Sequence, residues 1–357
     1  MTFRPVWQTR METNYHSEIL SESRYDEWLK FVIASPEGSV YAFPQYLAAL
    51  SRADGGRVTV VGVRFGDELV GGAALYEKDS RYGTYVSPRP LLYYNGVLLR
   101  RYDTRYPSER TARHLKTLNV LEPALSGRGH ARLTLASPSS MTDARPFLAA
   151  GWHVEPRYSY VVDISDLESL WTRVEQNLRR LVKRCEREGI TFHDDGDFDA
   201  FFRLHGSIMG RRDQMHYLPE AAFRGFLQEL HAASLCRLFE SRTSAGRVIA
   251  SQLVLLGPHP VCHVAAAATD QEFQRSGVSA FIRWKSFEAL SALGYKGVDL
   301  TDAALNAVSH FKSQLGGELR MTLLLDAPRS LAYRTISGTK DLLTRTISRL
   351  ASARGNR

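Results

Sequence analysis

The segment between residues 261 and 293 combines residue types and spacing that could bind a phosphate-bearing molecule. An apolar stretch, VCHVAAAAT (261–269), is followed by a loop with one glycine and then by the helical run FIRWKSFEALSAL. N–H groups in the first turn of a helix lack partners within it and lie at its positive end, so such a loop suits a pyrophosphate. A loop that only starts a packed helix is the alternative. The predicted donor-binding residues are Gln274, Arg275, Ser276, Gly277, Val278 and Ser279.

A second charged pattern lies in the run NLRRLVKRCEREGI (177–190). Basic side chains in this run could bind a phosphate backbone, or they could form a solvated surface that pairs with nearby glutamates. The first interpretation adds Arg180, Lys183 and Arg184 to the donor site, and we keep both. Apolar residues recur every three or four positions, as on the buried face of an amphipathic helix: Leu170, Val174, Leu178, Leu181 and Cys185.

Signatures of metal or covalent catalysis are missing from the sequence. The histidines show no metal-ligand spacing such as HExxH, and the cysteines Cys185, Cys236 and Cys262 are far apart, without a CxxC pair. No GxSxG segment occurs either. We therefore expect no metal and no covalent intermediate, so that the acceptor group would attack its target directly. Asp302 could accept the proton of that group, or it could cap a helix beginning near Ala303.

The elements that must position these residues follow from hydrophobic periodicity and turn signals. Both strands and helices are expected in each half, which predicts an α+β (mixed α/β) chain with a central mixed sheet flanked by helices. The expected strands are 57–65, 68–78, 91–98, 131–136, 160–164, 190–194, 235–241, 247–256, 261–269, 297–300 and 318–326. The expected helices are 108–125, 142–150, 165–189, 197–209, 218–232, 277–293 and 305–315.

The length of 357 residues exceeds what one hydrophobic core usually holds, which predicts two domains. A weak internal repeat agrees with this division. Residues 63–76 and 240–256 both predict strand-turn-strand units, and residues 146–156 and 310–320 both run from a helix end through Gly into a strand. Units of these kinds also arise by chance. The predicted parts are a first domain, 1–155, a second domain with the chemistry, 156–330, and a basic C-terminal tail, 331–357.

Two resemblances extend these expectations. Gln274-x-x-Gly277-x-Ser279 resembles the donor-binding Q/R-x-x-G-x-G/A loop of GNAT acyltransferases, with Ser279 in place of the usual Gly or Ala. Over about residues 25–326 the chain also resembles the Fem-type (FemABX) aminoacyltransferases. The similar segments are WLKFVIASPEGSVYAFPQYLAAL, NLRRLVKRCEREGI and VDLTDAALNAVSHFKSQLGGE.

The Fem-type resemblance implies two tandem GNAT-like domains that move an aminoacyl group from aminoacyl-tRNA to an amine. It implies that Phe311 and Lys312 lie at the transfer centre, where a lysine would stabilise the negative charge of the tetrahedral intermediate; an ordinary solvated lysine is the alternative. The first domain lacks the glycine loop and is expected to be a degenerate copy. Four residues are expected in the acceptor cleft: Tyr94, Asn95, Arg212 and Tyr217. For the segment with Tyr94 and Asn95, a packed core strand that ends in a turn is the preferred alternative.

Two alternatives remain for the function. One is an acyl-CoA-dependent N-acyltransferase, and the other is a non-catalytic module that binds tRNA or a nucleotide. In either enzyme the donor is a co-substrate, so no permanently bound cofactor is expected. The formal charge of +8 favours anionic partners. The sequence shows no apolar run of membrane-spanning or signal-peptide length, so we expect a cytoplasmic protein that acts on a small amine or a cell-envelope precursor.

Overall fold

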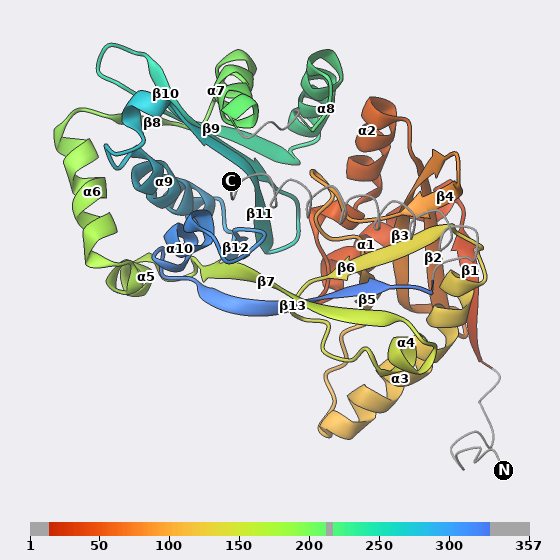
Figure 1. Ribbon diagram of the computed structural model, residues 1–357. Coiled ribbons are helices and arrows are strands. Elements are labelled where there is room, and N and C mark those ends of the chain that lie inside the picture. The colour runs from red at the N-terminus through yellow and green to blue at the C-terminus, as the bar shows by residue number, and fades with distance from the viewer. Residues whose placement is uncertain (1–13, 212–216, 329–357) are drawn as a thin grey trace, which may run out of the picture.

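The computed structural model describes residues 14–211 and 217–328 (Figure 1). The strands are β1 Tyr15–Leu20, β2 Arg57–Phe65, β3 Glu68–Ser80, β4 Gly83–Val86, β5 Val97–Leu99, β6 Arg132–Ser137, β7 His153–Asp163, β8 Thr191–His193, β9 Cys236–Arg242, β10 Val248–Leu255, β11 Val261–Thr269, β12 Gly297–Asp299 and β13 Glu318–Asp326. The helices are α1 Tyr25–Ala34, α2 Pro44–Asp54, α3 Pro107–Ser126, α4 Arg145–Ala149, α5 Leu167–Arg173, α6 Gln176–Arg187, α7 Phe198–Arg211, α8 Glu220–Ala232, α9 Val278–Ala292 and α10 Ala307–Ser313. Three 3-10 turns are η2 Glu22–Arg24, η3 Val40–Ala42 and η4 Gln271–Phe273.

All thirteen strands belong to one mixed sheet, which confirms the predicted fold class. The strand order is β1-β2-β3-β4-β6-β13-β7-β12-β11-β10-β9-β8, and β5 pairs with β3 beside this path. The pairs β4–β6 and β11–β12 are parallel, and the other neighbours are antiparallel. The long strands β7 and β13 run between the two lobes of the molecule (Figure 1).

The last strand of the chain joins the two halves. β13 lies between β6 and β7, and its pairing with β7 runs from Glu318↔Val161 to Asp326↔His153. The predicted boundary between residues 155 and 156 therefore falls inside β7, in the middle of a continuous ladder. The division into domains remains a prediction, but the backbone hydrogen bonds of the sheet cross it.

Both halves use the same succession of elements. In the first half, a hairpin (β2–β3) is followed by short strands, α3, β6, α4 and β7. In the second half, the hairpin β9–β10 is followed by β11, α9, β12, α10 and β13. The helix-Gly-strand similarity noted in the sequence lies at corresponding places, because Gly151 precedes β7 and Gly316 precedes β13, both with positive φ. The repeated order agrees with the internal repeat seen in the sequence.

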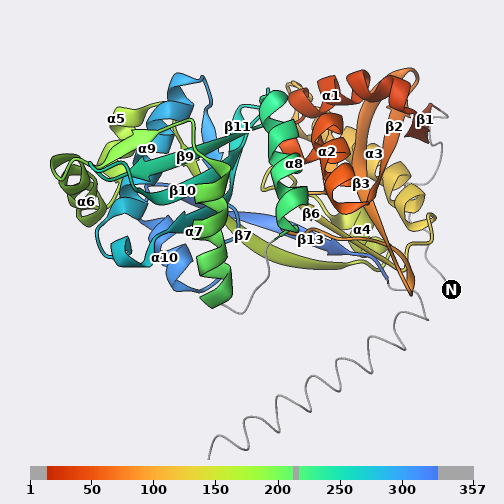
Figure 2. The same ribbon diagram turned by 90° about the horizontal axis from the view of Figure 1, so that it is seen from above.

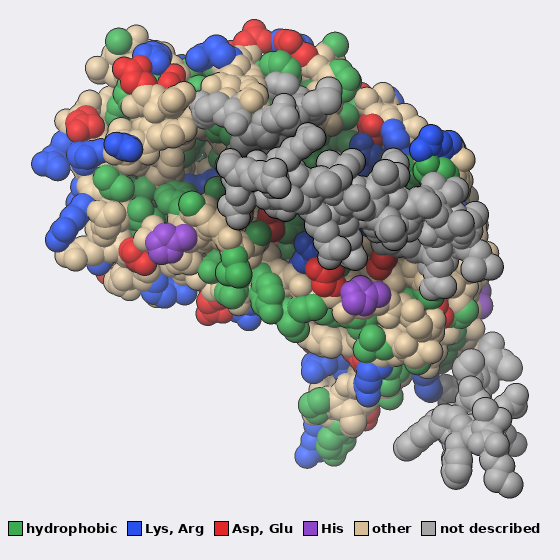
Figure 3. Space-filling model, viewed as in Figure 1, with side chains coloured by type: hydrophobic (Ala, Val, Ile, Leu, Met, Phe, Trp, Pro, Cys, Tyr) green, Lys and Arg blue, Asp and Glu red, His purple; other side chains and the backbone are tan. Residues whose placement is uncertain are grey.

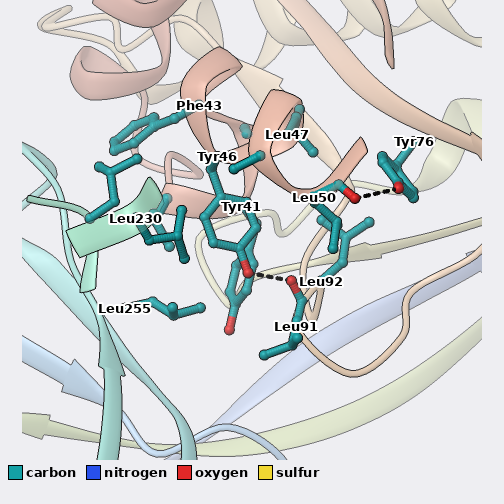
Figure 4. Close-up of a cluster of buried hydrophobic side chains, with 14 of the residues drawn as sticks. Tyr41, Phe43, Tyr46, Leu47, Leu50, Tyr76, Leu91, Leu92, Leu230 and Leu255 are labelled. Carbon is teal, nitrogen blue, oxygen red and sulfur yellow. Dashed lines mark hydrogen bonds between the residues drawn. The ribbon is translucent and has the colours of Figure 1, made fainter. Parts of the chain in front are cut away.

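Aromatic side chains of the first half pack against leucines of the second. Tyr41 and Tyr46 lie in one buried cluster with Leu230 and Leu255 (Figure 4). Helices α2 and α8 lie side by side over this cluster (Figure 2). The apolar contact and the shared sheet together hold the two halves against each other.

Most predicted elements are present within two or three residues of their expected limits, but the helix predicted over 165–189 is wrong in one respect. It is broken at Val174, whose backbone is extended (φ −66°, ψ 132°), so that α5 and α6 are separate helices. The backbone N–H of Glu175 bonds to the carbonyl of Gln314 instead of continuing the helix. Val174 stays buried. After the break, α6 packs against α9, and the apolar residues of α5 and α6 keep their contact with the core.

The strand predicted over 91–98 is also wrong in extent, because only Val97–Leu99 forms a strand. Leu91 has φ 63°, and the carbonyl and N–H of Arg89 bond to Leu92, so the chain turns where alternation predicted extension. Strands β1 and β4 were not predicted. No described helix is long and apolar enough to cross a lipid bilayer.

Candidate active site

Two parallel strands separate at the centre of the second half. β11 and β12 pair over three residues only, from Val261↔Gly297 to His263↔Asp299. Beyond this point, β11 continues beside β10. It carries a bulge at Ala265, because Leu253 pairs with Ala266 whereas Val254 pairs with Val264. A bulge bends the strand that carries it. The last pair before the separation, His263 and Asp299, is buried at the point where the two strands part.

Asp299 connects three parts of the structure although its side chain is buried. Its Oδ2 accepts a hydrogen bond of 2.8 Å from the Tyr94 hydroxyl of the first half. Its Oδ1 accepts from the Ser159 hydroxyl on β7 and, at 2.8 Å, from the backbone N–H of Thr301. Hydrogen bonds to the charged form of a buried carboxylate compensate its lost hydration. Asp299 thus fixes the Tyr94 hydroxyl and the loop after β12 relative to each other.

His263 lies beside this carboxylate without bonding to it. Its Nδ1 is 3.8 Å from Asp299 Oδ2, and neither ring nitrogen has a hydrogen-bond partner among the described residues. The ring packs against Tyr41 and Tyr94, with centroid distances of 5.1 and 5.8 Å. Burial lowers the pKa of His263 to about 4, more than the nearby Asp299 raises it. His263 is therefore neutral at pH 7 and cannot supply a proton there.

The loop after β12 makes an unusual turn that Lys312 holds. Thr301 and Asp302 have φ values of 49° and 46°, in the left-handed region that side chains other than glycine rarely adopt. The Lys312 ammonium on α10 donates to the Thr301 carbonyl and, at 2.7 Å, to the Asp302 carbonyl. A further bond joins the Thr301 hydroxyl to the carbonyl of Val264 on β11, at 2.9 Å. We call residues 301 and 302 the Lys312-held turn.

The charge of Lys312 is held in a buried position. Its side chain is 9% exposed, and the pKa is lowered to about 8, first by burial and then by the positive charge of Arg283 on α9. Asp302 and Asp299 oppose this shift. The Nη1 of Arg283 is itself buried without a hydrogen-bond partner in the described part of the chain. The buried Lys312 on α10 and the half-buried Arg283 on α9 are thus two neighbouring cations.

A pocket of about 550 Å³ opens beside the Lys312-held turn, between the two halves. We call it the central pocket. Tyr93, Tyr94 and Tyr217 line it together with Asp302 and Ala265, the bulged residue of β11. Arginines from other elements complete the lining: Arg89, Arg132 and Arg157. The structure therefore brings together three residues that the sequence singled out: Tyr94 and Tyr217, expected in the acceptor cleft, and Asp302, the expected proton acceptor.

The remaining expected site residues are placed differently. Asn95 bonds through its side chain to the backbone of Thr134 and Ala136 and lines a small separate cavity, so it stabilises the fold beside the central pocket. Asp302 does not cap a helix, because Asn306 caps α10 by accepting from the Ser309 N–H. Phe311 is half-buried against the core of the second half. Arg212 lies outside the described residues.

The expected donor loop has the conformation that its glycine predicts. Gly277 has φ 97° and directly precedes α9. A Cβ atom at this position would lie 2.7 Å from Leu181 Cβ on α6, so close packing as well as φ requires glycine. Ser276 accepts the N–H of Val278 through its hydroxyl, at 3.3 Å, and the Ser279 hydroxyl lies 2.9 Å from that of Thr269.

Helix α6 packs on this loop and extends it with positive charge. Arg184 donates to the carbonyls of Ser276 and, at 3.3 Å, Arg275, so this arginine ties α6 to the loop. Arg180, Lys183 and Arg187 line a shallow, open depression on the outside of α6. Lys and Arg side chains gather at the left edge of the view in Figure 3, where Figure 1 shows α6. We call these three exposed residues the α6 basic face.

Sequence reasoning missed Asp299, His263 and Arg283. Asp299 carried a usable signal, because a carboxylate within the apolar run GVDL, expected to be a buried strand, needs several partners. His263 packs against Tyr41 and Tyr94, and Arg283 lies near Lys312; these neighbours come from distant parts of the chain and left no local pattern. Within residues 14–211 and 217–328, no three metal-ligating side chains lie close enough to hold an ion.

Comparisons with known proteins agree with this geometry. Residues 172–313 match the family model described as an acetyltransferase (GNAT) domain. No curated protein sequence matches the chain. Among solved structures, FemX is similar with a TM-score of 0.65 and 12% identity, over 87% of this chain and 96% of that one. The C-terminal domain of a putative lysylphosphatidylglycerol synthetase from Agrobacterium fabrum gives 0.57 and 13%, over 90% and 98%. A tandem GNAT protein from the clavulanic acid biosynthesis pathway gives 0.54 and 14%, over 88% and 99%.

The second half therefore carries a GNAT acyltransferase domain, which includes the donor loop, the separation of β11 and β12, and Lys312. Within that class, the whole chain has the FemABX-like arrangement of two GNAT-like halves. GNAT domains usually take acyl-CoA as a co-substrate and hold no permanent cofactor. The family model and the fold both agree with the resemblance seen in the sequence.

Proposed function

We propose that this protein transfers an aminoacyl group from an aminoacyl-tRNA to an amine that enters the central pocket. The observation that carries the proposal is the network around Asp299. It joins the point where β11 and β12 separate to the Tyr94 hydroxyl of the pocket and to the Lys312-held turn. The structural similarity to FemX and to lysylphosphatidylglycerol synthetases is in keeping with this chemistry.

The proposed donor contacts explain why α6 is basic. The donor loop uses part of its own hydrogen-bonding capacity, because the Ser276 N–H bonds to the Phe273 carbonyl and the Val278 N–H bonds to the Ser276 hydroxyl. The α6 basic face is on the outside of α6, and Arg184 of the same helix bonds to the donor loop. A donor with several phosphates in a row would contact both, and its binding would be sensitive to salt.

The proposed transfer needs no cofactor. The amine nitrogen attacks the ester carbonyl and forms the new C–N bond, and negative charge develops on the carbonyl oxygen. Lys312 uses two N–H bonds on the Lys312-held turn, which leaves one to stabilise that oxygen. Asp302, in the central pocket, accepts the proton of the amine and returns it to the departing ribose oxygen. The products are an amide and uncharged tRNA.

Hydroxylamine, a small amine that fits any acceptor pocket, provides the test. Total tRNA charged with a mixture of labelled amino acids is incubated with the protein and hydroxylamine, and the loss of label from tRNA is followed against the uncatalysed reaction. We expect the protein to accelerate the loss, and Lys312→Ala to reduce the acceleration at least 100-fold. Lys296→Ala, a change of the same type outside the site, should leave it within twofold. No acceleration with any charged tRNA would contradict the proposal.

An acyl-CoA-dependent N-acyltransferase is the second candidate. The observation in its favour is the left-handed Gly277 at the start of α9, inside the segment that matches the GNAT family model. The same assay with acetyl-CoA and palmitoyl-CoA separates the two candidates. Acceleration with a thioester alone would identify this second function. Acceleration with neither donor, together with tRNA binding, would leave the non-catalytic module.

A further inference from the structure

A second cavity, of about 560 Å³, lies in the first half and shares no lining residue with the central pocket. It is formed by the segment after β5, the first turns of α3 and the loop between β6 and α4. Its buried lining residues are Glu37, Leu99, Tyr102 and Met141. We call it the α3 cavity.

Glu37 is a buried charged group whose hydrogen bonding is incomplete. Its residue surface is 5% exposed. Its Oε2 accepts from the backbone N–H of Leu99 at 3.0 Å and from the Ser35 hydroxyl at 2.9 Å. Among the described residues, Oε1 has no hydrogen-bond partner. Burial raises the pKa of Glu37. Hydrogen bonds from Leu99, from Ser35 and from the backbone of Glu37 itself, together with the nearby His114, oppose that shift without cancelling it. Glu37 lines both the α3 cavity and the small cavity beside Asn95, and a donor that reached Oε1 from the α3 cavity would relieve the cost of burial.

The entrance of the cavity determines which donor fits. Arg110 and Arg101 are exposed lining residues, and Arg101 lies 3.5 Å from Asp103. Asp143 bonds to Arg145 at 2.6 Å, so its charge is already neutralised. Arg101 is paired as well, which leaves Arg110 as the exposed lining charge without an ion pair among the described residues, and the half-buried His114 also lines the cavity. Arg110 opposes a second positive charge, while the buried Glu37 carboxylate attracts a first one.

We propose that the α3 cavity binds a compact molecule with one primary ammonium group, and that the Glu37 carboxylate is its counter-ion. The bound ammonium donates to Oε1, and the apolar part of the molecule lies against Leu99, Tyr102 and Met141. An amine held in this way stays protonated and unreactive, so the cavity is a binding site apart from the transfer reaction. The inference does not depend on the proposed function.

Ligand-observed NMR with n-butylamine and n-butanol tests the proposal on the full-length protein. The two probes have the same shape and differ in charge. We expect saturable binding of n-butylamine, binding at least tenfold weaker for n-butanol, and weaker binding for butane-1,4-diamine because of its second cation. Equal binding of the amine and the alcohol, or no saturable binding of the amine, would overturn the proposal.

Four variants locate the site. Glu37→Gln keeps an oxygen for Leu99 and Ser35 but directs an amide N–H₂ into the cavity, and it should weaken n-butylamine binding at least tenfold. Asp103→Asn removes an exposed charge at the entrance and should change binding less than twofold. Asp302→Asn tests the central pocket, and unchanged binding there assigns the amine to the α3 cavity.

Ser140→Trp tests the same site without changing Glu37, and it keeps the test valid if the Glu37→Gln protein does not fold. Ser140 is exposed at the entrance, so a tryptophan there blocks the cavity and leaves Glu37 and its partners intact. We expect it to abolish binding with unchanged circular dichroism. Full n-butylamine binding by a folded Ser140→Trp protein, or its loss in Asp302→Asn alone, would place the amine elsewhere and contradict the proposal.

Discussion

The two halves of the molecule place buried groups of opposite charge, Glu37 and Lys312, beside corresponding segments. In the first half, the segment after β5, the start of α3 and the β6–α4 loop enclose the α3 cavity around the Glu37 carboxylate. In the second half, the corresponding segments are the donor loop, the start of α9 and the β12–α10 loop with the buried ammonium of Lys312. In the two proposals made above, the same topology holds a cation in one half and an anion in the other.

The starts of the two helices show how the difference arises. α3 begins at Pro107, which has no N–H to offer a phosphate, and no glycine precedes it. α9 begins after Gly277 in the left-handed conformation. The β12–α10 loop then adds a turn that would be strained without Lys312, whereas the β6–α4 loop has no residue with positive φ before Gly151. The proposed donor binding in the second half thus depends on a few backbone positions.

The largest expected effect comes from breaking the network that makes the second groove distinctive. Asp299→Asn leaves one carbonyl oxygen for the three donors on Tyr94, Ser159 and Thr301. We expect the hydroxylamine-dependent deacylation of aminoacyl-tRNA to fall about 100-fold, because the turn and the Tyr94 hydroxyl lose their common support. The free energy of unfolding should fall by about 1–3 kcal/mol.

The control for this change is Asp163→Asn. Asp163 also accepts two hydrogen bonds, both from Ser165, but it is exposed and lies at the far end of β7. It should leave the deacylation rate within twofold. An Asp299→Asn protein with full activity would show that the network supports the fold and has no part in transfer.

The next effect concerns Gly277, which precedes α9 and has no counterpart at the start of α3. Gly277→Ala introduces both a strained φ and a contact of 2.7 Å with Leu181. Gly246→Ala introduces a similar φ, 82°, with nothing within 4 Å of the added Cβ. We expect urea unfolding to show Gly277→Ala about 1–3 kcal/mol less stable than Gly246→Ala. Equal stability would mean that α6 moves away freely, and that the donor loop is not fixed by packing.

Sequence reasoning reached the segments that carry local patterns. The alternation of β2, β3 and β11, the glycine before α9 and the apolar stripe of α5 and α6 each depend on residues close together in the chain. The break at Val174 could not be predicted in this way, because its cause is a hydrogen bond to Gln314, far along the sequence.

The same distinction explains the candidate site. Asp302, Tyr94 and Tyr217 were assigned to the site by sequence and do line one pocket. Lys312 was expected to stabilise charge, but its bonds to the Lys312-held turn were not foreseen, because left-handed Thr and Asp residues have no sequence signature. Asp299 and Glu37 depend on partners from both neighbouring strands and distant loops. Buried charges are positioned by tertiary structure, and their identity alone does not reveal their partners.

A smaller effect concerns the pair of cations between α9 and α10. The Lys312 pKa of about 8 predicts that activity falls above pH 8, as the ammonium loses its proton. Arg283→Leu removes the nearby positive charge, so the pKa should rise and the alkaline limb of kcat/KM should move to higher pH. Arg283→Lys keeps the charge and should leave the limb in place. The shift will be partial because burial, the larger cause, remains. A limb that does not move in Arg283→Leu would contradict the role of Lys312.

The smallest expected effect is on the pH dependence of stability and arises from His263. Its pKa is about 4 in the folded protein and near 6.5 in an unfolded chain, so below pH 6.5 the unfolded chain binds a proton that the folded one does not. Stability must then fall as pH decreases from 6.5 to 4, by at most about 1.4 kcal/mol per pH unit from this group. His263→Phe keeps the ring contacts with Tyr41 and Tyr94 and removes this contribution.

Urea unfolding at pH 7, 6 and 5 measures the difference, with His153→Phe, an exposed change at the start of β7, as the control. The slope of stability against pH should be shallower in His263→Phe and unchanged in His153→Phe. The result bears on the comparison between the two halves. If His263 is neutral, Lys312 and Arg283 remain the cations described in the second groove. If His263→Phe keeps the slope of the original protein, the pKa of His263 does not differ between the folded and unfolded states, and the ring gains a positive charge in the groove below about pH 6.5.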